Sequence, residues 1–404
     1  MEFVQGGVCA AKGFTAAGIH CGFRKNKEKK DLALIVSETR AAAACVYTTN
    51  LVKGAPIAVT KANVADGYAQ AIICNSGNAN TCNANGIEIA EGMCALASET
   101  LGIPATDVVV ASTGVIGQPL SLEPAKARIH DLAAALSPVG SGDAAAAIMT
   151  TDTAVKEVAV SFEIGGVSCK MGGIAKGSGM IHPNMATMLV FITTDCAIAP
   201  SLLQAALSAD VADSFNMVSV DGDTSTNDMV TVLANGMAGN APIAEAGTDY
   251  DAFCAALAAV TRTLCRMIAA DGEGATKLLD CTVTGAADIA TAKAAAKSVI
   301  CSSLVKAAMF GADANWGRVL CALGYAGVQL DTGKIDVSFE SAAGKIAVCK
   351  NGAGVDFDED TAKQILSQKE IRILVTLGDG NASAEAWGCD LTYDYVKING
   401  DYRT

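Results

Sequence analysis

The stretch from residue 176 to residue 195 constrains the fold most, because a glycine-rich turn leads there directly into an apolar segment. Residues 188–194 are almost all apolar or β-branched, which predicts a strand inside a covered sheet. Upstream, Gly177 and Gly179 allow the backbone to bend closely around a neighbouring group. The pattern therefore predicts that the hydroxyl of Thr187 is held at the edge of a buried strand.

Two interpretations of this hydroxyl are open. In the simpler one, Thr187 only caps a strand, as many threonines do. In the other, the hydroxyl attacks the carbonyl of Ala186, the chain is cut, and Thr187 becomes a new N-terminus whose α-amine acts as the base. A free α-amine titrates near ~7.7–8.0, so a useful fraction is unprotonated at neutral pH. The residue pattern alone does not decide between the two.

A resemblance favours the nucleophile. The block KGSGMIHPNMATMLVFITTD at 176–195 resembles the signature of the ornithine acetyltransferase (glutamate N-acetyltransferase) family of arginine biosynthesis, in which the Ala-Thr bond is the autoproteolysis site. Further blocks similar to that family follow one another along most of the chain: STGVIG at 112–117, MTTDT at 149–153, VDGDTSTND at 220–228, ADGEGATK at 270–277, LVKAAMFGADANWGR at 304–318 and YVKINGDYRT at 395–404.

The resemblance implies an α/β sandwich like that of the self-processing aminopeptidases. It implies transfer of an acetyl group from N2-acetyl-L-ornithine to L-glutamate through an acetyl ester on Thr187. It also implies cleavage between Ala186 and Thr187 and a heterotetramer of two 1–186 and two 187–404 chains. Use of acetyl-CoA as a second donor stays open, because members of the family differ in it and no nucleotide-binding motif settles it. No other cofactor is expected.

The resemblance also assigns site residues. The predicted strand at 107–112 runs into Thr113 and Gly114, and a glycine amide beside a hydroxyl is the usual material of an oxyanion hole, although Ser-Thr-Gly turns are common. Both substrates carry an α-carboxylate, for which the family places a lysine at Lys176. The remaining implied substrate contacts are Thr153, Thr187, Glu273, Asn399 and Thr404. On residue type alone, Lys176 reads as an exposed lysine, Glu273 as part of a helix-ending turn and the last residues as a frayed terminus.

Composition excludes several classes of protein. The 404 residues carry a net charge of −13, which argues against nucleic-acid or anionic membrane partners. The basic run at 24–30 contains Glu28 and is interpreted as a solvated turn between strands. The N-terminus lacks the basic and apolar regions of a signal peptide, and no uncharged apolar run reaches membrane-spanning length, so we expect a soluble cytoplasmic protein.

Neither disulfides nor a metal site is expected. The 15 cysteines are odd in number, form no Cys-x-x-Cys pair and lie mostly in apolar runs, so they read as small buried hydrophobes in a reducing compartment. The three histidines lie far apart in the sequence. The acidic turn at 221–228 resembles the start of a calcium loop but lacks the closing glutamate.

The length of 404 residues and the change to an alanine- and lysine-rich segment after Gly285 predict two domains, a catalytic α/β domain at 1–284 and a smaller α+β domain at 285–404. Strands are predicted at 32–36, 57–60, 71–74, 107–112, 157–162, 167–171, 188–194, 216–220, 229–234, 334–339, 345–350 and 370–377. Helices are predicted at 86–101, within 120–149 with a break around 137–142, and at 201–213, 250–270, 289–308 and 360–368.

Two rival functions remain at this stage. A self-processing amidase or aminopeptidase of the same fold would pass the acyl group to water instead of an amine. A non-catalytic amino-acid-binding protein would use Thr187 only to cap a strand and would stay uncut.

Overall fold

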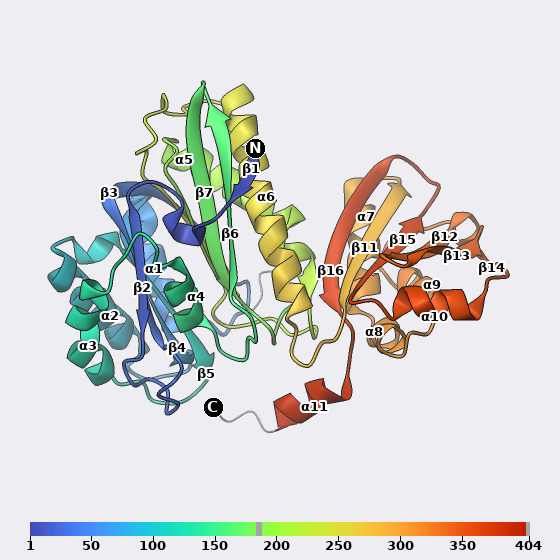
Figure 1. Cartoon of the computed structure of the whole chain (residues 1–404), viewed down its shortest axis with the longest axis horizontal. Helices are drawn as coiled ribbons and strands as arrows, with labels where there is room; N and C mark the ends of the chain where they lie inside the picture. Colours follow the sequence, from blue (N-terminus) through green and yellow to red (C-terminus); the bar gives the residue numbers. More distant parts are fainter. Residues whose placement is uncertain (183–187, 401–404) are drawn as a thin grey trace.

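A computed structural model describes residues 1–182 and 188–400 of the chain (Figure 1). Within these residues the strands form two sheets. The first has nine strands in the order β1-β6-β7-β8-β10-β3-β4-β5, with β2 paired to β3. Its strands are β1 (Glu2–Val4), β2 (Phe14–Ile19), β3 (Leu32–Tyr47), β4 (Tyr68–Asn78), β5 (Val108–Val115), β6 (Lys156–Ile164), β7 (Val167–Lys176), β8 (Leu189–Thr194) and β10 (Met229–Ala234).

The second sheet has seven strands in the order β14-β13-β12-β15-β11-β16-β9, again counted over the described residues. Its strands are β9 (Val218–Ser219), β11 (Leu278–Ala286), β12 (Asp336–Ser341), β13 (Gly344–Lys350), β14 (Ala353–Gly354), β15 (Glu370–Thr376) and β16 (Ala382–Cys389). Both sheets mix parallel and antiparallel pairs and are covered by helices, which confirms the predicted α/β class.

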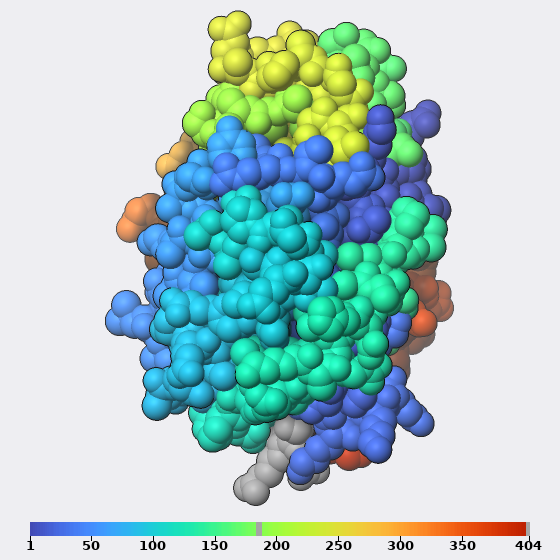
Figure 2. All heavy atoms as spheres, turned by 90° about the vertical axis from the view of Figure 1, so that its left-hand side faces the viewer, coloured from blue at the N-terminus to red at the C-terminus, as the bar shows by residue number. Residues whose placement is uncertain are grey.

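Helices cover the first sheet on both faces. Those around it are α1 (Ala55–Asn63), α2 (Gly86–Leu101), α3 (Glu123–Ala134), α4 (Ser141–Ile148), α5 (Pro200–Asp213) and α6 (Thr248–Ala270). Figure 2 shows the outer face of this layer, with α2 in cyan and α3 in teal. The second sheet carries α7 (Ile289–Cys301), α8 (Ser303–Phe310), α9 (Trp316–Gly324) and α10 (Glu359–Leu366), and α11 (Tyr393–Gly400) runs apart from it below both sheets (Figure 1).

Strand β8 lies in the middle of the first sheet, as the sequence predicts. Val190 and Ile192 belong to the hydrophobic cluster that includes α5 and α6, whereas Leu189 and Phe191 belong to the cluster of α4 on the opposite face. All six residues of the strand are buried. Each such apolar side chain stabilises the fold by roughly 1.5–3 kcal/mol relative to an exposed one, so this strand is a fixed support for the turn that precedes it.

Helix α6 is the helix of the described residues that is long and apolar enough, by length and composition, to cross a membrane. In the fold it lies between β6 and β7 of the first sheet and β16 of the second (Figure 1). Phe253, Leu257 and Leu264 on it are fully buried. On the same helix, Arg262 binds Glu385, 3.1 Å away on β16. It is therefore the core helix that joins the two layers.

Most predicted elements are confirmed, and two are wrong. The run 57–60 is part of helix α1 and not a strand, because Pro56 stands in the first turn of a helix, where its missing N–H costs nothing. The single helix predicted at 289–308 is two helices, since the side chain of Ser302 accepts the backbone N–H of Val305 and starts α8. The prediction also omitted strands β1, β2, β11, β14 and β16.

The predicted domain boundary at 284 stays a prediction. Strand β11 crosses that position and pairs with β15 and β16. Strand β9, which lies earlier in the chain, also pairs with β16.

The basic run at 24–30 is a turn between β2 and β3, as expected. All 15 cysteines are free, and most are buried.

Candidate active site

The site lies where three neighbouring strands of the first sheet begin or end. Strands β7 and β8 are antiparallel, with Lys176 opposite Leu189, so the turn with the predicted cleavage site connects them. Strand β10 runs parallel to β8, and the backbone N–H of Met188 donates to Oδ1 of Asp228 at 2.9 Å. Ala186 and Thr187 lie outside the described residues, but the residue that follows them in the chain is thereby anchored.

A small cavity of about 80 Å³ opens at this place. It brings together five of the residues that the sequence proposed, from four separate elements: Thr113 and Gly114 on β5, Lys176 at the end of β7, Glu273 after α6 and Asn399 on α11. Gly179 and Met180, which precede the predicted cleavage site, also line it. The strand order of the sheet therefore assembles groups that are far apart in the sequence.

Gly114 must be a glycine for reasons of space and backbone geometry. Its φ is +134°, and a Cβ on it would lie 2.3 Å from the carbonyl carbon of Gly77 and 2.5 Å from the backbone nitrogen of Asn78. Next to it, Thr113 is almost completely buried. The β4–β5 ladder thus fixes a bare amide and a hydroxyl at the cavity wall, as an oxyanion hole requires.

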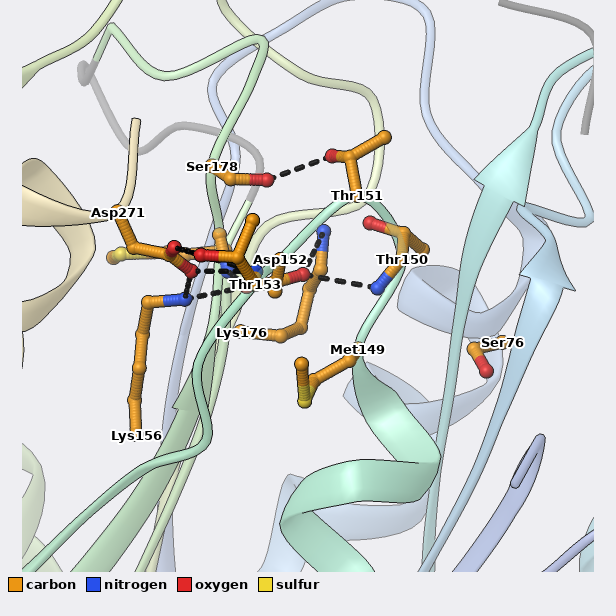
Figure 3. Close-up of polar contacts among 12 residues, drawn as sticks. Ser76, Met149, Thr150, Thr151, Asp152, Thr153, Lys156, Lys176, Ser178 and Asp271 are labelled. Carbon is orange, nitrogen blue, oxygen red and sulfur yellow. Dashed lines mark hydrogen bonds and ion pairs between the residues drawn. The ribbon is translucent and has the colours of Figure 1, made fainter. Parts of the chain in front are cut away.

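The carboxylate of Asp152 organises a buried set of charges behind the cavity (Figure 3). It accepts from the ammonium of Lys156 at 2.7 Å and from the backbone N–H of Gly177 at 2.7 Å, and Nζ of Lys176 lies 3.9 Å away. Lys156 also binds Asp271. Burial on its own would raise the pKa of Asp152, but Lys176 and Lys156 outweigh it and hold that pKa well below its usual range.

Lys176 is a buried ammonium group that lines the cavity. Its side chain is 2% exposed, and its burial lowers its pKa from the ordinary value while the carboxylate of Asp152 opposes that shift. Asp152 is shared with Lys156 and lies closer to it, and Lys156 has Asp271 as a second carboxylate partner. Of these two ammonium groups, Lys176 is the one that lines the cavity, so a ligand carboxylate entering it would meet Lys176.

The opposite wall carries a negative charge. The carboxylate of Glu273 accepts from Nδ2 of Asn399 at 2.8 Å, and its backbone N–H donates to the carbonyl of Ser178 at 2.8 Å. A Cβ on Gly179 would lie 2.3 Å from Cδ of Glu273. The glycine turn is therefore open at the point where this carboxylate reaches the cavity, and α11 supplies its amide partner.

The other predicted contacts are placed elsewhere. Thr153 does not line the cavity, because its hydroxyl and its backbone N–H both donate to Asp271, the latter at 3.1 Å. Thr150 and Thr151 of the same block line the cavity in its place. The hydroxyls of Thr151 and Ser178 are hydrogen-bonded at 2.7 Å, as Figure 3 shows. Thr404 lies outside the described residues.

Two residues of the site were missed from the sequence, Asp152 and Asp228. Asp228 is completely buried, and its Oδ2 has no hydrogen-bond partner among the residues that the structure describes. That burial raises the pKa of Asp228 well above its usual range. The available signal was an acid directly before a mostly apolar strand, β10, where Asp228 accepts the backbone N–H of Met188.

The acidic turn at 221–228 has a structural role near the site. The carboxylate of Asp221 accepts the backbone N–H groups of Met180 and Ile181 at 2.6 and 2.8 Å. Over residues 1–182 and 188–400, no group of three or more potential ligands is placed to hold a metal ion. The turn thus shapes the chain just before the predicted cleavage site.

An α/β fold that fixes an amide and a hydroxyl opposite a buried lysine defines an enzyme of the acyl-transfer class. The model of the ArgJ family matches residues 15–404. The arginine biosynthesis bifunctional protein ArgJ of Symbiobacterium thermophilum is 53% identical over 406 residues and that of Caldanaerobacter subterraneus 50% over 405, each covering all of both chains. The chain therefore belongs to the ArgJ family, and it is an acyltransferase of arginine biosynthesis.

Solved structures of relatives align with this chain in part. That of the arginine biosynthesis bifunctional protein of Bacillus halodurans is 46% identical, with a TM-score of 0.50, and covers 52% of this chain and 98% of its own. An ornithine acetyltransferase of Mycobacterium tuberculosis, solved in complex with ornithine, is 33% identical, with a TM-score of 0.41, over 45% of this chain and 97% of its own.

Proposed function

We propose that this enzyme cuts itself between Ala186 and Thr187 and then transfers an acetyl group from N2-acetyl-L-ornithine to L-glutamate through an acetyl ester on Thr187. The observation that carries the proposal is the cavity that unites Thr113, Gly114 and Lys176 beside the anchored Met188. Its opposed charges suit an N-acylated amino acid that carries an α-carboxylate and a side-chain ammonium group.

In the first half-reaction, the hydroxyl of Thr187 attacks the acetyl carbonyl of N-acetylornithine and gives its proton to the Thr187 α-amine. Thr113 and Gly114 donate to the oxyanion, a contribution of roughly 3–4 kcal/mol per donor. The C–N bond then breaks, the proton passes to the leaving amine, and ornithine departs. The acetyl group remains as an ester on the threonine.

In the second half-reaction, the amine of glutamate attacks this ester and restores the hydroxyl. Both amino acids carry an α-carboxylate, so Lys176 can hold either one in the same place. The side-chain ammonium of ornithine suits the carboxylate of Glu273, with Asn399 orienting that carboxylate. One site thus serves donor and acceptor in turn.

Assembly and location form part of the proposal. We infer a heterotetramer of two 1–186 and two 187–404 chains in the cytoplasm. The solved chain of the Bacillus halodurans relative aligns over 98% of its own length with only 52% of this chain. This supports an enzyme made of two chains. The burial of α6 between the two sheets supports a soluble protein.

Mass spectrometry and product analysis test the proposal together. Denatured wild-type protein should give the fragments 1–186 and 187–404, and N-acetylornithine alone should add one acetyl group to the second fragment. Thr187→Ala should stay uncut and inactive, whereas Thr263→Ala, which removes a hydroxyl on α6 remote from the cavity, should cut and transfer normally. Cleavage after Ala186 in Thr187→Ala would refute the mechanism.

The same assay separates transfer from hydrolysis. An enzyme of this function forms N-acetylglutamate much faster than acetate when glutamate is present. Acetate as the main product would make the chain an amidase, and an uncut wild-type chain without acetylation would make it a binding protein.

A further inference from the structure

The two reacting parts of the active site stand on strands that are not neighbours in the sheet. Met188, which follows the proposed nucleophile, directly precedes β8, whereas Thr113 and Gly114 belong to β5. Strands β10, β3 and β4 lie between β8 and β5, which places the two roughly 19 Å apart along the sheet at the usual strand spacing of about 4.8 Å. Sheet pairing alone therefore does not fix how the nucleophile faces the oxyanion hole.

The end of β5 is also irregularly paired with its neighbour β4. The register of the β4–β5 ladder shifts directly after the pair Gly77–Gly114. Such an irregularity interrupts the hydrogen bonds between the strands and bends the strand that carries it. A contact from outside the ladder that holds this place therefore bears on the position of the oxyanion-hole amide.

Asn227 makes such a contact. It lies directly before Asp228 and β10, is 5% exposed and lines the active-site cavity. Its Nδ2 donates to the carbonyl of Ser112 at 3.0 Å and to the carbonyl of Ala79 at 2.6 Å. The carbonyl of Ser112 belongs to the peptide group that leads into Thr113. The bond from Asn227 therefore holds an oxyanion-hole residue through its own backbone.

The amide of Asn227 is itself fixed by its neighbours. Its Oδ1 accepts from the hydroxyls of Thr81 and Thr226 at 2.6 and 2.5 Å. Backbone carbonyls only accept hydrogen bonds, so the two carbonyls opposite Nδ2 determine which way the amide points. A side-chain amide has two donor hydrogens and an oxygen with two lone pairs, and all four are used here. The side chain therefore serves the geometry of the protein and not the binding of a substrate.

The next residue, Asp228, holds the other half of the site. Its carboxylate accepts the backbone N–H of Met188 at 2.9 Å, and its carbonyl accepts the backbone N–H of Thr48 at 3.1 Å. Two successive residues thus contact the two halves: Asn227 contacts the end of β5, and Asp228 contacts the residue after the nucleophile. The peptide bond that joins them is planar and rigid, so the two contacts are held at a fixed separation.

We propose that Asn227 is a positioning residue for acyl transfer, which sets the distance between the Thr187 hydroxyl and the oxyanion hole. It acts through the backbone of Ser112 and does not touch the reacting atoms. The proposal rests on the proposed function, because it requires the acetyl ester on Thr187. Misplacing a catalytic group by about 1 Å costs on the order of 10²-fold in rate, so loss of Asn227 should affect kcat more than KM.

The test compares Asn227→Ala with Asn240→Ala as its matched control. Asn240 is also a buried asparagine, 6% exposed, whose amide is hydrogen-bonded to the backbone of Ala197 and Ala241, but it does not line the cavity. Both variants should lose stability, because each leaves buried backbone groups without their partner. We expect kcat for transfer from N-acetylornithine to fall about 10- to 100-fold in Asn227→Ala, with KM within about twofold of the wild type. In Asn240→Ala, both kcat and KM should stay close to the wild-type values.

An infrared spectrum of the acetyl enzyme separates positioning from stability. Hydrogen bonds from the oxyanion hole lower the stretching frequency of the ester carbonyl on Thr187, which isotope-labelled N-acetylornithine makes visible. The frequency should rise in Asn227→Ala and keep its wild-type value in Asn240→Ala. A loss of stability alone would not move it.

Thr81→Val carries the test if Asn227→Ala stays uncut. It removes a hydroxyl that orients the amide but leaves Asn227 in place, and it should lower kcat about tenfold, with the same rise in the carbonyl frequency. Equal kcat values in Asn227→Ala and Asn240→Ala overturn this inference and leave the proposed function intact, as does an unshifted carbonyl in a cut variant. A wild type that forms no acetyl ester from N-acetylornithine overturns the proposed function itself.

Discussion

The two sides of the active-site cavity are built in different ways. On one side, Lys176 and Gly114 stand at the ends of ladder-paired strands and Asp152 lies in the segment before β6, and both charged side chains are almost completely buried. On the other side, α11 has no buried residue. It is held through contacts such as those from Asn399 to Glu273 and from the hydroxyl of Tyr395 to Asp221, at 2.8 and 3.2 Å.

Because of this difference, we expect the two sides of the cavity to have different roles in the reaction. Groups that stabilise a developing charge must not move during the reaction, and the strand ends provide that rigidity. Exposed backbone and few apolar contacts mark elements that open at low cost in free energy, which substrate exchange requires. We therefore expect changes on the strand side to affect stability or kcat strongly and changes on α11 to affect mainly KM.

The largest expected effect is on stability. Asp152→Asn leaves Lys156 and Lys176 buried with less compensation, and we expect it to lower the free energy of unfolding by about 3–5 kcal/mol. Asp143→Asn, which breaks an exposed pair with Lys30, should cost less than about 1 kcal/mol. Urea unfolding measures both variants. Equal losses would mean that burial does not distinguish the two pairs.

Asp152→Asn should also alter how the free energy of unfolding depends on pH in the acid range. Because the pKa of Asp152 is depressed in the fold, its contribution is present above the unfolded pKa of about 3.9 and is lost as the pH falls through the folded value. Wild-type stability should therefore fall more steeply at low pH than that of Asp152→Asn.

The next effect is on catalysis. Gly114→Ala forces β5 away from Gly77 and displaces the amide, so kcat for transfer from N-acetylornithine should fall by about 10²–10³. Gly142→Ala on α4, where an added Cβ meets nothing within 4 Å, is the control and should be active. Steady-state kinetics with purified variants measure both, and a Gly114→Ala enzyme of normal kcat would remove this amide from the mechanism.

The contrast also explains what the sequence could predict. Long periodic segments such as 86–101 were predicted to the residue, because sixteen positions show which face is apolar. Four residues at 57–60 show no period, and Pro56 was the better signal of a helix. The fold class therefore followed from the sequence more securely than the short elements did.

Site residues were predictable through resemblance and only partly in their contacts. The motif blocks identified Thr113, Gly114 and Lys176, which the strand ends then bring together. The partner of Thr153 is Asp271, 118 positions away, and no local pattern reports such a contact. Asp228 was missed for the same reason, since its burial depends on β8 and β10 lying side by side.

Asp228 offers a smaller effect that depends on pH. It is tested in the uncut Thr187→Ala background, where no new α-amine can pair with it. A raised carboxyl pKa means that its stabilising protonation is complete below about pH 3.9 and is lost as the pH rises through the folded value. The stability of Asp228→Asn relative to the background should therefore increase with pH, by about 1–3 kcal/mol. A difference that is constant from pH 4 to 9 would contradict the raised pKa.

The smallest effect is expected on the helix side of the cavity. Asn399→Ala removes the amide that orients the carboxylate of Glu273, a hydrogen bond to a charged group that contributes about 1.5 kcal/mol, so the KM for N-acetylornithine should rise about tenfold. Stability should be unchanged, because α11 buries no side chain. Val396→Ala, on the same helix and 70% exposed, is the control and should leave both KM and kcat unchanged. A large fall in kcat for Asn399→Ala, with KM unchanged, would show that α11 takes part in the chemical step. It would contradict the expectation that the strand side sets kcat and the helix side sets KM.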